Sequence, residues 1–222
     1  MRLVEDERVK TGWADRQEAG RALGVALRAY KGKDVVVIGL PRGGVVVAAE
    51  VARALGAPLD VRIARKIGAP GQPELALGAV TADGHRVLHD ALLRHFLLPP
   101  GWLAEATQAA RDAAKERERR LRGQRSAEPL AGRTVLLVDD GIATGMTVRA
   151  AVDAILDEAP ASLVVAAPVI APDAYADLAQ RVERVVPLLV PDDFIAVGQF
   201  YRRFDQTEDD EVQALLAAAP RA

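Results

Sequence analysis

The apolar positions of this chain follow two patterns that take turns along the sequence. Short unbroken apolar runs, such as VVVI at 35–38 and VLLV at 135–138, are typical of strands that are buried on both faces of a sheet. Between these runs, apolar residues return every three or four positions, which is typical of amphipathic helices. The alternation predicts the α/β class: an open, mostly parallel twisted sheet with helices on both faces.

The same pattern places the individual elements. A first helix is expected after Asp15, whose carboxylate would cap it, and a second is expected to stop at Gly56. A strand that starts at Leu59 is expected to run into a Gly/Pro-rich loop that reaches Glu74. The last helix is expected to be capped by Thr207. The remaining predictions are strands at 34–40, 134–140, 162–170 and 184–190, and helices near 47–55, 148–156 and 172–182.

The length of 222 residues suits a single domain spanning 1–222, with one insertion at about 75–125. The insertion is expected to hold a hairpin that turns at Asp83-Gly84, followed by a long polar helix over 101–122. This helix contains the charge run KERERRLR. Because the signs alternate and no aromatic residues interleave, a solvated helix face explains the run better than nucleic-acid binding does.

Composition narrows the function classes. The sequence has no cysteine, which excludes disulfides, thiolate metal sites and a cysteine nucleophile, and only three histidines, which argues against a dedicated transition-metal site. A formal net charge of −2 gives no bulk attraction to nucleic acid or to anionic membranes. The first residues have no apolar core of a secretory signal, and no segment has the length of a membrane span. We therefore expect a cytoplasmic protein without nucleic-acid or membrane partners.

Two adjacent carboxylates end the clearest strand of the sequence, at Asp139 and Asp140. A buried, unpaired carboxylate pair is costly, so we expect these groups to meet solvent, hydroxyl donors or a cation. Vicinal sugar hydroxyls would supply donors, and Mg²⁺ prefers oxygen ligands of this type. The alternative is that the pair only ends a strand and caps a helix.

The residues that follow favour a ligand. The segment ATGMT opens a helix, and the free N–H groups of a helix start bind anions. The hydroxyls of Thr144 and Thr147 add donors, and Gly145 lets the backbone approach closely. A ligand that carries a diol next to a phosphate would satisfy both halves. The phosphate-binding residues are therefore predicted to be Ala143, Thr144, Gly145, Met146 and Thr147.

In open parallel sheets, ligands bind beyond the carboxyl ends of the strands. Three segments lie at such ends: 40–44, 64–70 and 139–147. We expect them to meet in one crevice. Two glycines before a helix, with Arg42 beside them, would form a compact anion-binding loop there.

VLLVDDGIATGMT resembles the phosphoribosyl-pyrophosphate (PRPP) signature of the type I phosphoribosyltransferase family. The resemblance implies that Asp139 and Asp140 contact the ribose hydroxyls, and through them or through water a Mg²⁺ ion. It implies that the loop at 143–147 binds the 5′-phosphate. The family often has a cis peptide in its pyrophosphate loop, for which Pro41-Arg42 is the candidate here.

The resemblance also indicates which residues would bind the pyrophosphate of PRPP. Residues Pro41, Arg42, Gly43 and Gly44 are similar to the family's pyrophosphate loop, and Arg65-Lys66 resembles the Arg-Lys pair of adenine phosphoribosyltransferases. Cations there would neutralise the charge that develops on the leaving group. With the acidic pair, Arg42 and Lys66 are the predicted catalytic residues. Glu74 is the nearby carboxylate that could act as acid or base, with a plain surface residue as the alternative.

A hood over about 187–206 is implied by PDDFIAVGQFYRRFD, in which Phe194 would stack on the base and the Ile195 backbone would read its edge. Two residues and one spacing depart from the family pattern. Gly141 replaces an aliphatic residue and is expected to loosen the turn. Ala143 replaces the acid/base aspartate of the 6-oxopurine enzymes. The spacing to Gly198 is one residue longer.

The implied function is transfer of a phosphoribosyl group from Mg-PRPP to a nitrogenous base, with release of pyrophosphate. Two alternatives stay open: a non-catalytic regulator that senses PRPP or a nucleotide, and a hydrolase or phosphorylase of a phosphoribosyl compound. The sequence does not identify the base. It leaves the oligomeric state open, with a homodimer as one candidate.

Overall fold

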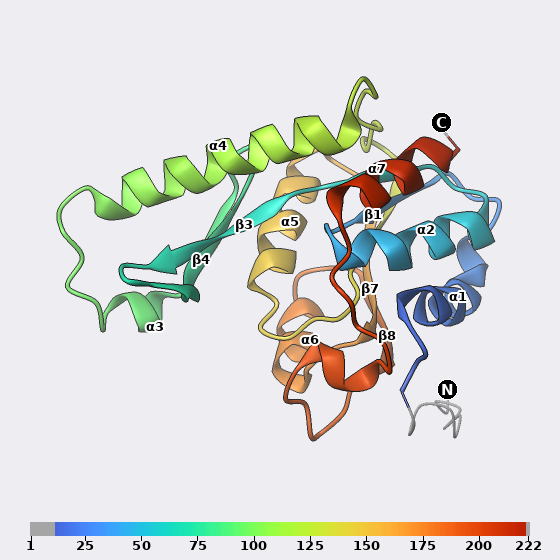
Figure 1. Cartoon of the computed structure of the whole chain (residues 1–222). Coiled ribbons are helices and arrows are strands. Elements are labelled where there is room, and N and C mark those ends of the chain that lie inside the picture. The colour runs from blue at the N-terminus through green and yellow to red at the C-terminus, as the bar shows by residue number, and fades with distance from the viewer. Residues whose placement is uncertain (1–11, 221–222) are drawn as a thin grey trace.

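The computed structural model describes residues 12–220, without the side chains of Pro73 and Glu74. Its centre is a five-stranded, fully parallel sheet with the strand order β2-β1-β6-β7-β8 (Figure 1). The predicted parallel sheet is therefore confirmed. Its strands are β1 (Val35–Gly39), β2 (Leu59–Val61), β6 (Thr134–Val138), β7 (Ser162–Val169) and β8 (Arg184–Leu189).

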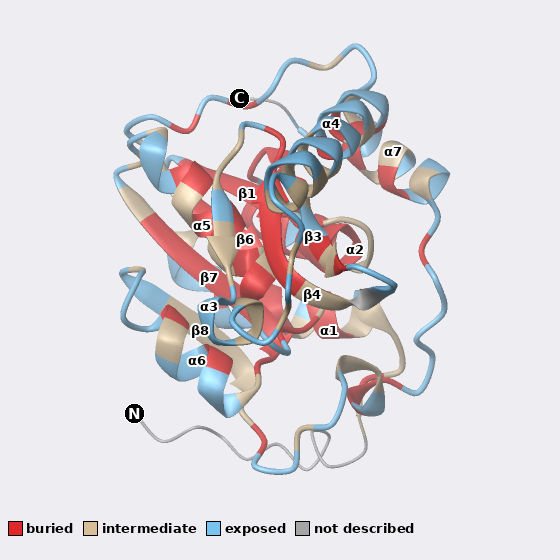
Figure 2. Ribbon diagram, turned by 90° about the vertical axis from the view of Figure 1, so that its left-hand side faces the viewer, coloured by how far each residue is buried: buried red, intermediate tan, exposed pale blue. Residues whose placement is uncertain are grey.

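Helices cover both faces of this sheet because alternate strand residues point to opposite sides. Val35 and Val37 pack with α1 (Arg16–Ala26) and α2 (Gly43–Leu55), whereas Val36 and Ile38 pack on the other side. That second face is covered by α5 (Met146–Asp157) and α6 (Pro172–Leu178). Figure 2 shows the central strands as the buried part of the molecule. We call the sheet and these helices the body.

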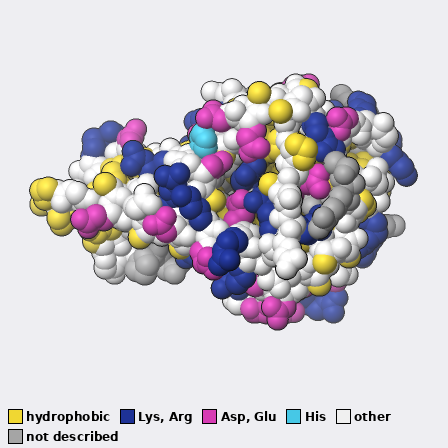
Figure 3. All heavy atoms as spheres, turned by 90° about the horizontal axis from the view of Figure 1, so that it is seen from above, with side chains coloured by type: hydrophobic (Ala, Val, Ile, Leu, Met, Phe, Trp, Pro, Cys, Tyr) yellow, Lys and Arg dark blue, Asp and Glu magenta, His cyan; other side chains and the backbone are white. Residues whose placement is uncertain are grey.

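An arm projects from the body and comprises residues 64–122 (Figures 1 and 3). Its antiparallel sheet has the order β3-β4-β5, and the long helix α4 runs back along it to the body. The hairpin at Asp83-Gly84 and the helix at 101–122 lie where the sequence predicts them. The arm elements are β3 (Ala64–Ala69), β4 (Gln72–Thr81), β5 (Arg86–Leu88), α3 (Asp90–Leu93) and α4 (Trp102–Arg122).

The predicted Gly/Pro-rich loop before Glu74 is wrong. The chain leaves the central sheet after Val61, and β3 then pairs with β4 from Ala64 onwards. The pairing buries apolar side chains of both strands, including Ile67 and Leu77. Burial of these residues turns most of the expected loop into a ladder and leaves only the turn between β3 and β4.

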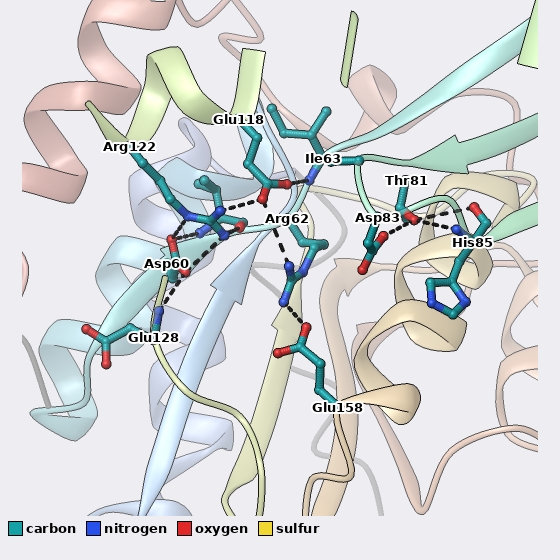
Figure 4. Close-up of polar contacts among 12 residues, drawn as sticks. Asp60, Arg62, Ile63, Thr81, Asp83, His85, Glu118, Arg122, Glu128 and Glu158 are labelled. Atoms are coloured by element: carbon teal, nitrogen blue, oxygen red, sulfur yellow. Dashed lines mark hydrogen bonds and ion pairs between the residues drawn. The ribbon is translucent and has the colours of Figure 1, made fainter. Parts of the chain in front are cut away.

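Buried charges join the arm to the body (Figure 4). Arg122 of α4 donates from Nε to Oδ1 of Asp60 on β2 at 2.8 Å, and also contacts Glu118. Glu118 in turn accepts from the backbone N–H of Ile63 at 3.0 Å. Arg62, between β2 and β3, pairs with Glu118 at 3.9 Å and contacts Glu158, the C-cap residue of α5. The inserted helix is thus fixed to the edge of the central sheet by paired charges as well as by apolar contacts.

The C-terminal segment crosses the body and ends beside α4 (Figure 1). It contains the short 3-10 helix η3 (Val197–Phe200) and helix α7 (Asp209–Ala218), and a further 3-10 turn, η2 (Arg28–Tyr30), follows α1. The predicted cap at Thr207 is wrong. Thr207 is buried and Glu208 holds the N-cap position of α7, without a side-chain capping bond.

Over residues 12–220, no helix has both the length and the apolar character needed to span a membrane.

Candidate functional site

The acidic pair lies at the carboxyl end of β6, directly against the glycine loop that follows β1. A Cβ on Gly44 would lie 2.6 Å from Oδ1 of Asp139, and a Cβ on Gly43 would overlap the carboxylate of Asp140. Only glycine permits this approach, because any other side chain would displace the carboxylates. The structure therefore brings together two of the three segments predicted to form one crevice.

The carboxylates of the pair differ in their surroundings. Oδ1 of Asp139 accepts the backbone N–H of Asp140 at 2.9 Å. Burial, and next the negative charge of Asp140, raise the pKa of Asp139 well above its usual range. Such a pair is stabilised by a cation or by hydroxyl donors.

Arg16, from the first turn of α1, already supplies one cation. Its Nε donates to Oδ2 of Asp140 at 2.6 Å, and its guanidinium lies 3.8 Å above the ring centre of Phe204. Tyr201 donates its hydroxyl to the backbone carbonyl of Asp140. Burial and then the charge of Asp140 raise the pKa of this tyrosine, so it stays a neutral donor. Sequence reasoning missed both residues.

The predicted phosphate loop lies between Asp140 and α5. Ile142 anchors it, because its N–H donates to the carbonyl of Val169 and its own carbonyl accepts from Ala171. Ala143 and Thr144 are exposed, and Gly145 takes the left-handed conformation (φ +70°) as the residue before α5. Met146 and Thr147 form the start of that helix. The first N–H groups of a helix have no intrahelical partner and are available to an anion.

The third predicted segment meets the glycine loop in a pocket of about 510 Å³. Pro41, Arg65 and Lys66 line it, together with Arg117 from α4. The Pro41-Arg42 peptide is cis, as the family resemblance suggested. Arg65 and Lys66 are exposed on β3. The side chain of Glu74 lies outside those that the structure describes.

The predicted base-binding residues lie beside an aromatic cluster. The ring of Phe194 is 5.7 Å from that of Phe200, which is buried with Trp13 and Tyr201. Ile195 is exposed, and its backbone N–H donates to Oε1 of Gln199 at 2.8 Å. Phe194 is partly buried in this packing.

Gly141 explains one departure from the family pattern. A Cβ there would overlap the side chain of Val197 and lie 3.0 Å from Cγ1 of Val169. Close packing therefore requires glycine here, and the expected loosening of the turn stays a prediction. Glycine lets the segment at 194–200 pack directly onto the residue that follows the acidic pair.

The chemistry of the acidic pair suits Mg²⁺, which binds few carboxylates and keeps water or substrate oxygens as further ligands. Among the side chains described within residues 12–220, no group of three or more His, Asp or Glu gathers as a metal site. An ion at Asp139 and Asp140 would thus need ligands from the substrate as well as from the chain.

Known proteins share this architecture. Residues 14–204 match the phosphoribosyl transferase domain. Two Mycobacterium tuberculosis proteins that carry the phosphoribosyl transferase name, MT0597 (strain CDC 1551) and Rv0571c (strain H37Rv), are each 46% identical over 207 residues, 93% of this chain. The alignment covers 47% of their length, so this chain spans about half of the curated relatives it matches. The crystal structure of TT1426 from Thermus thermophilus is 45% identical, with a TM-score of 0.77, covering 92% of this chain and 97% of that one. The chain therefore belongs to the phosphoribosyl transferase domain family.

Proposed function

We propose that this chain binds PRPP with Mg²⁺ and transfers its phosphoribosyl group to a nitrogenous base, releasing pyrophosphate. The observation that supports this most directly is the contact between the acidic pair and the glycine loop. It brings carboxylates suited to a diol next to a loop suited to an anion, at the carboxyl ends of neighbouring parallel strands β6 and β1.

Each part of the donor then has a complementary group. Asp139 and Asp140 accept from the ribose hydroxyls, and the loop at 143–147 with the start of α5 binds the 5′-phosphate. The pyrophosphate lies toward the glycine loop, where Arg42, Arg65 and Lys66 supply positive charge. The aromatic cluster beside Phe194 borders the side on which the base arrives. Mg²⁺, when bound, would offset the charge of the pyrophosphate.

The reaction exchanges one bond at the anomeric carbon for another. The bond to the pyrophosphate oxygen breaks and its electron pair leaves with pyrophosphate, while a nitrogen lone pair of the base forms the new bond. A proton on that nitrogen is lost to solvent. The chain contributes positioning and stabilises the charge that develops on the leaving group.

The test is release of pyrophosphate from Mg-PRPP in the presence of a panel of purine and pyrimidine bases. We expect release that depends on one class of base and yields the matching nucleoside monophosphate. Omitting the base is the matched control.

The other outcomes have distinct meanings. Release without any base would favour the hydrolase alternative. PRPP binding with no release for any base would favour the regulator, and would contradict the proposed transfer.

A further inference from the structure

Arg117 lies on the inserted helix α4 and lines the same pocket as Pro41, Arg65 and Lys66. The other cations of the pocket, Arg65 and Lys66, lie on β3, and α4 brings Arg117 back to them from the far end of the same arm. Its side chain is 23% exposed. The pocket thus has positive side chains on two of its walls.

The contacts of Arg117 leave part of its guanidinium free for a ligand. Its Nη2 donates to Oδ1 of Asp209 at 2.6 Å. Its Nε is buried and has no hydrogen-bond partner among the residues that the structure describes. Because the side chain is partly exposed and lines the pocket, the part of the guanidinium that Asp209 does not occupy can contact an anion there.

The start of α7 holds Arg117 close to the glycine loop. The neighbouring residues Glu208 and Asp209 pair with Arg42 and Arg117 respectively, at 3.6 Å and 2.6 Å. Burial raises the pKa of Asp209, but the hydrogen bond and charge of Arg117, with the charges of Arg120 and Arg42, together leave that pKa lower than usual. Arg42 and Arg117 are therefore gathered around one short acidic segment.

We propose that Arg117 is a pyrophosphate-binding residue, supplied by the inserted arm, which acts with Arg42 and Lys66 on the same anion. The acidic start of α7 holds this guanidinium in place while the pocket is empty of anion. The inference rests on the proposed function, because it assigns the pyrophosphate end of the donor to this pocket.

The chain offers a matched control in Arg120. It pairs with the same Asp209, at 3.0 Å, but is 56% exposed and does not line the pocket. If Arg117 only fastened α7 to α4, replacing either arginine would have a similar effect. If Arg117 binds the anion, only its own replacement would matter to pyrophosphate.

The experiment is calorimetric titration of the full chain with Mg-pyrophosphate. We expect Arg117→Ala to weaken binding at least tenfold, and Arg120→Ala to change it less than twofold. Asp209→Asn should leave binding unchanged or tighten it, because the amide oxygen can still accept from Arg117 while the competing negative charge is lost. Arg117→Gln, which keeps a polar side chain but removes the guanidinium, replaces the alanine variant if thermal unfolding shows that the latter does not fold.

Equal losses in the Arg117 and Arg120 variants, or a loss in Asp209→Asn as large as in Arg117→Ala, would overturn the inference. So would an Arg117 variant that binds as tightly as the wild type. Each of these outcomes leaves the proposed transfer reaction standing. A wild-type chain that binds neither pyrophosphate nor PRPP would instead overturn the proposed function, and this inference with it.

Discussion

Asp15, just before α1, contacts the hood segment at 187–206. Asp15 caps α1 by accepting the N–H of Glu18 at 2.9 Å, and also pairs with Arg203 at 2.6 Å. The neighbouring Arg16 reaches Asp140. Asp15 thus stabilises the start of α1, and the next residue, Arg16, pairs with Asp140 of the acidic pair.

Replacing Asp15 should therefore lower the free energy of unfolding. The hydrogen bond from Glu18, and more weakly the contact with Arg203, lower the pKa of Asp15 in spite of its partial burial. A lowered folded-state pKa stabilises the protein above the unfolded-state value of about 3.9, and this contribution is lost as pH falls through the folded-state pKa. We expect Asp15→Ala to cost about 1 kcal/mol at pH 7.

Urea unfolding at pH 7 and at about pH 3.5 measures the effect. Asp15→Asn is the matched control, since asparagine caps helices nearly as well but loses the charge pair with Arg203. A cost of Asp15→Ala that stays constant down to the lower pH would contradict the role of the charged carboxylate.

Sequence reasoning reached some of these residues and not others. The acidic pair and the glycine loop follow from local patterns, because strand ends and helix starts determine what lies beside them. Arg16 and Tyr201 have no such signal. Each acts on Asp140 across a long stretch of chain, and nothing in the local sequence marks the contact. The need for Gly141 likewise arises from Val197, which only the folded chain brings near.

At the scale of elements, the attachment of the arm decides where its cations lie. Arg65 and Lys66 on β3 and Arg117 on α4 reach the pocket because α4 is anchored to the edge of the central sheet. The sequence predicts α4 and the β4–β5 hairpin, but not β3. The Gly and Pro residues near its end favoured a loop, and pairing with β4 outweighed that local preference.

Arg122 is the residue to change at this junction. The substitution Arg122→Met would remove the guanidinium that pairs with both Asp60 and Glu118, whose carboxylates are buried. Breaking such a buried pair costs about 3–5 kcal/mol. We expect a loss of that size in the free energy of unfolding, measured with denaturant.

The matched control is Arg119→Met on the same helix. Arg119 is 76% exposed and, among the described residues, pairs only with Glu116, so its replacement should cost less than about 0.5 kcal/mol. Equal effects of the two substitutions would contradict the anchoring role of Arg122.

At the scale of the molecule, the body supplies the acidic pair, the glycine loop and the start of α5, while the arm and α7 add charged groups at one end. The parallel sheet places the first three together by its topology alone, which is why the crevice could be predicted from sequence. Arg65 and Lys66 of the arm were expected there too, but the contribution of α4 could not be predicted, because its position depends on the buried charge pairs that Figure 4 shows. The proposed donor site lies on the body, and the role proposed for Arg117 adds the helix α4 of the arm to the same site.

The central claim is that Asp139 and Asp140 bind the ribose of Mg-PRPP, and calorimetric titration with Mg-PRPP tests it most directly. The double variant Asp139→Asn with Asp140→Asn should weaken binding by at least about 100-fold, since each lost charge-assisted hydrogen bond is worth roughly 1.5–3 kcal/mol. Asp192→Asn with Asp193→Asn changes the net charge equally at an exposed pair after β8, and should bind within about twofold of the wild type. Unchanged affinity in the Asp139 and Asp140 variant, with the fold intact, would contradict the account.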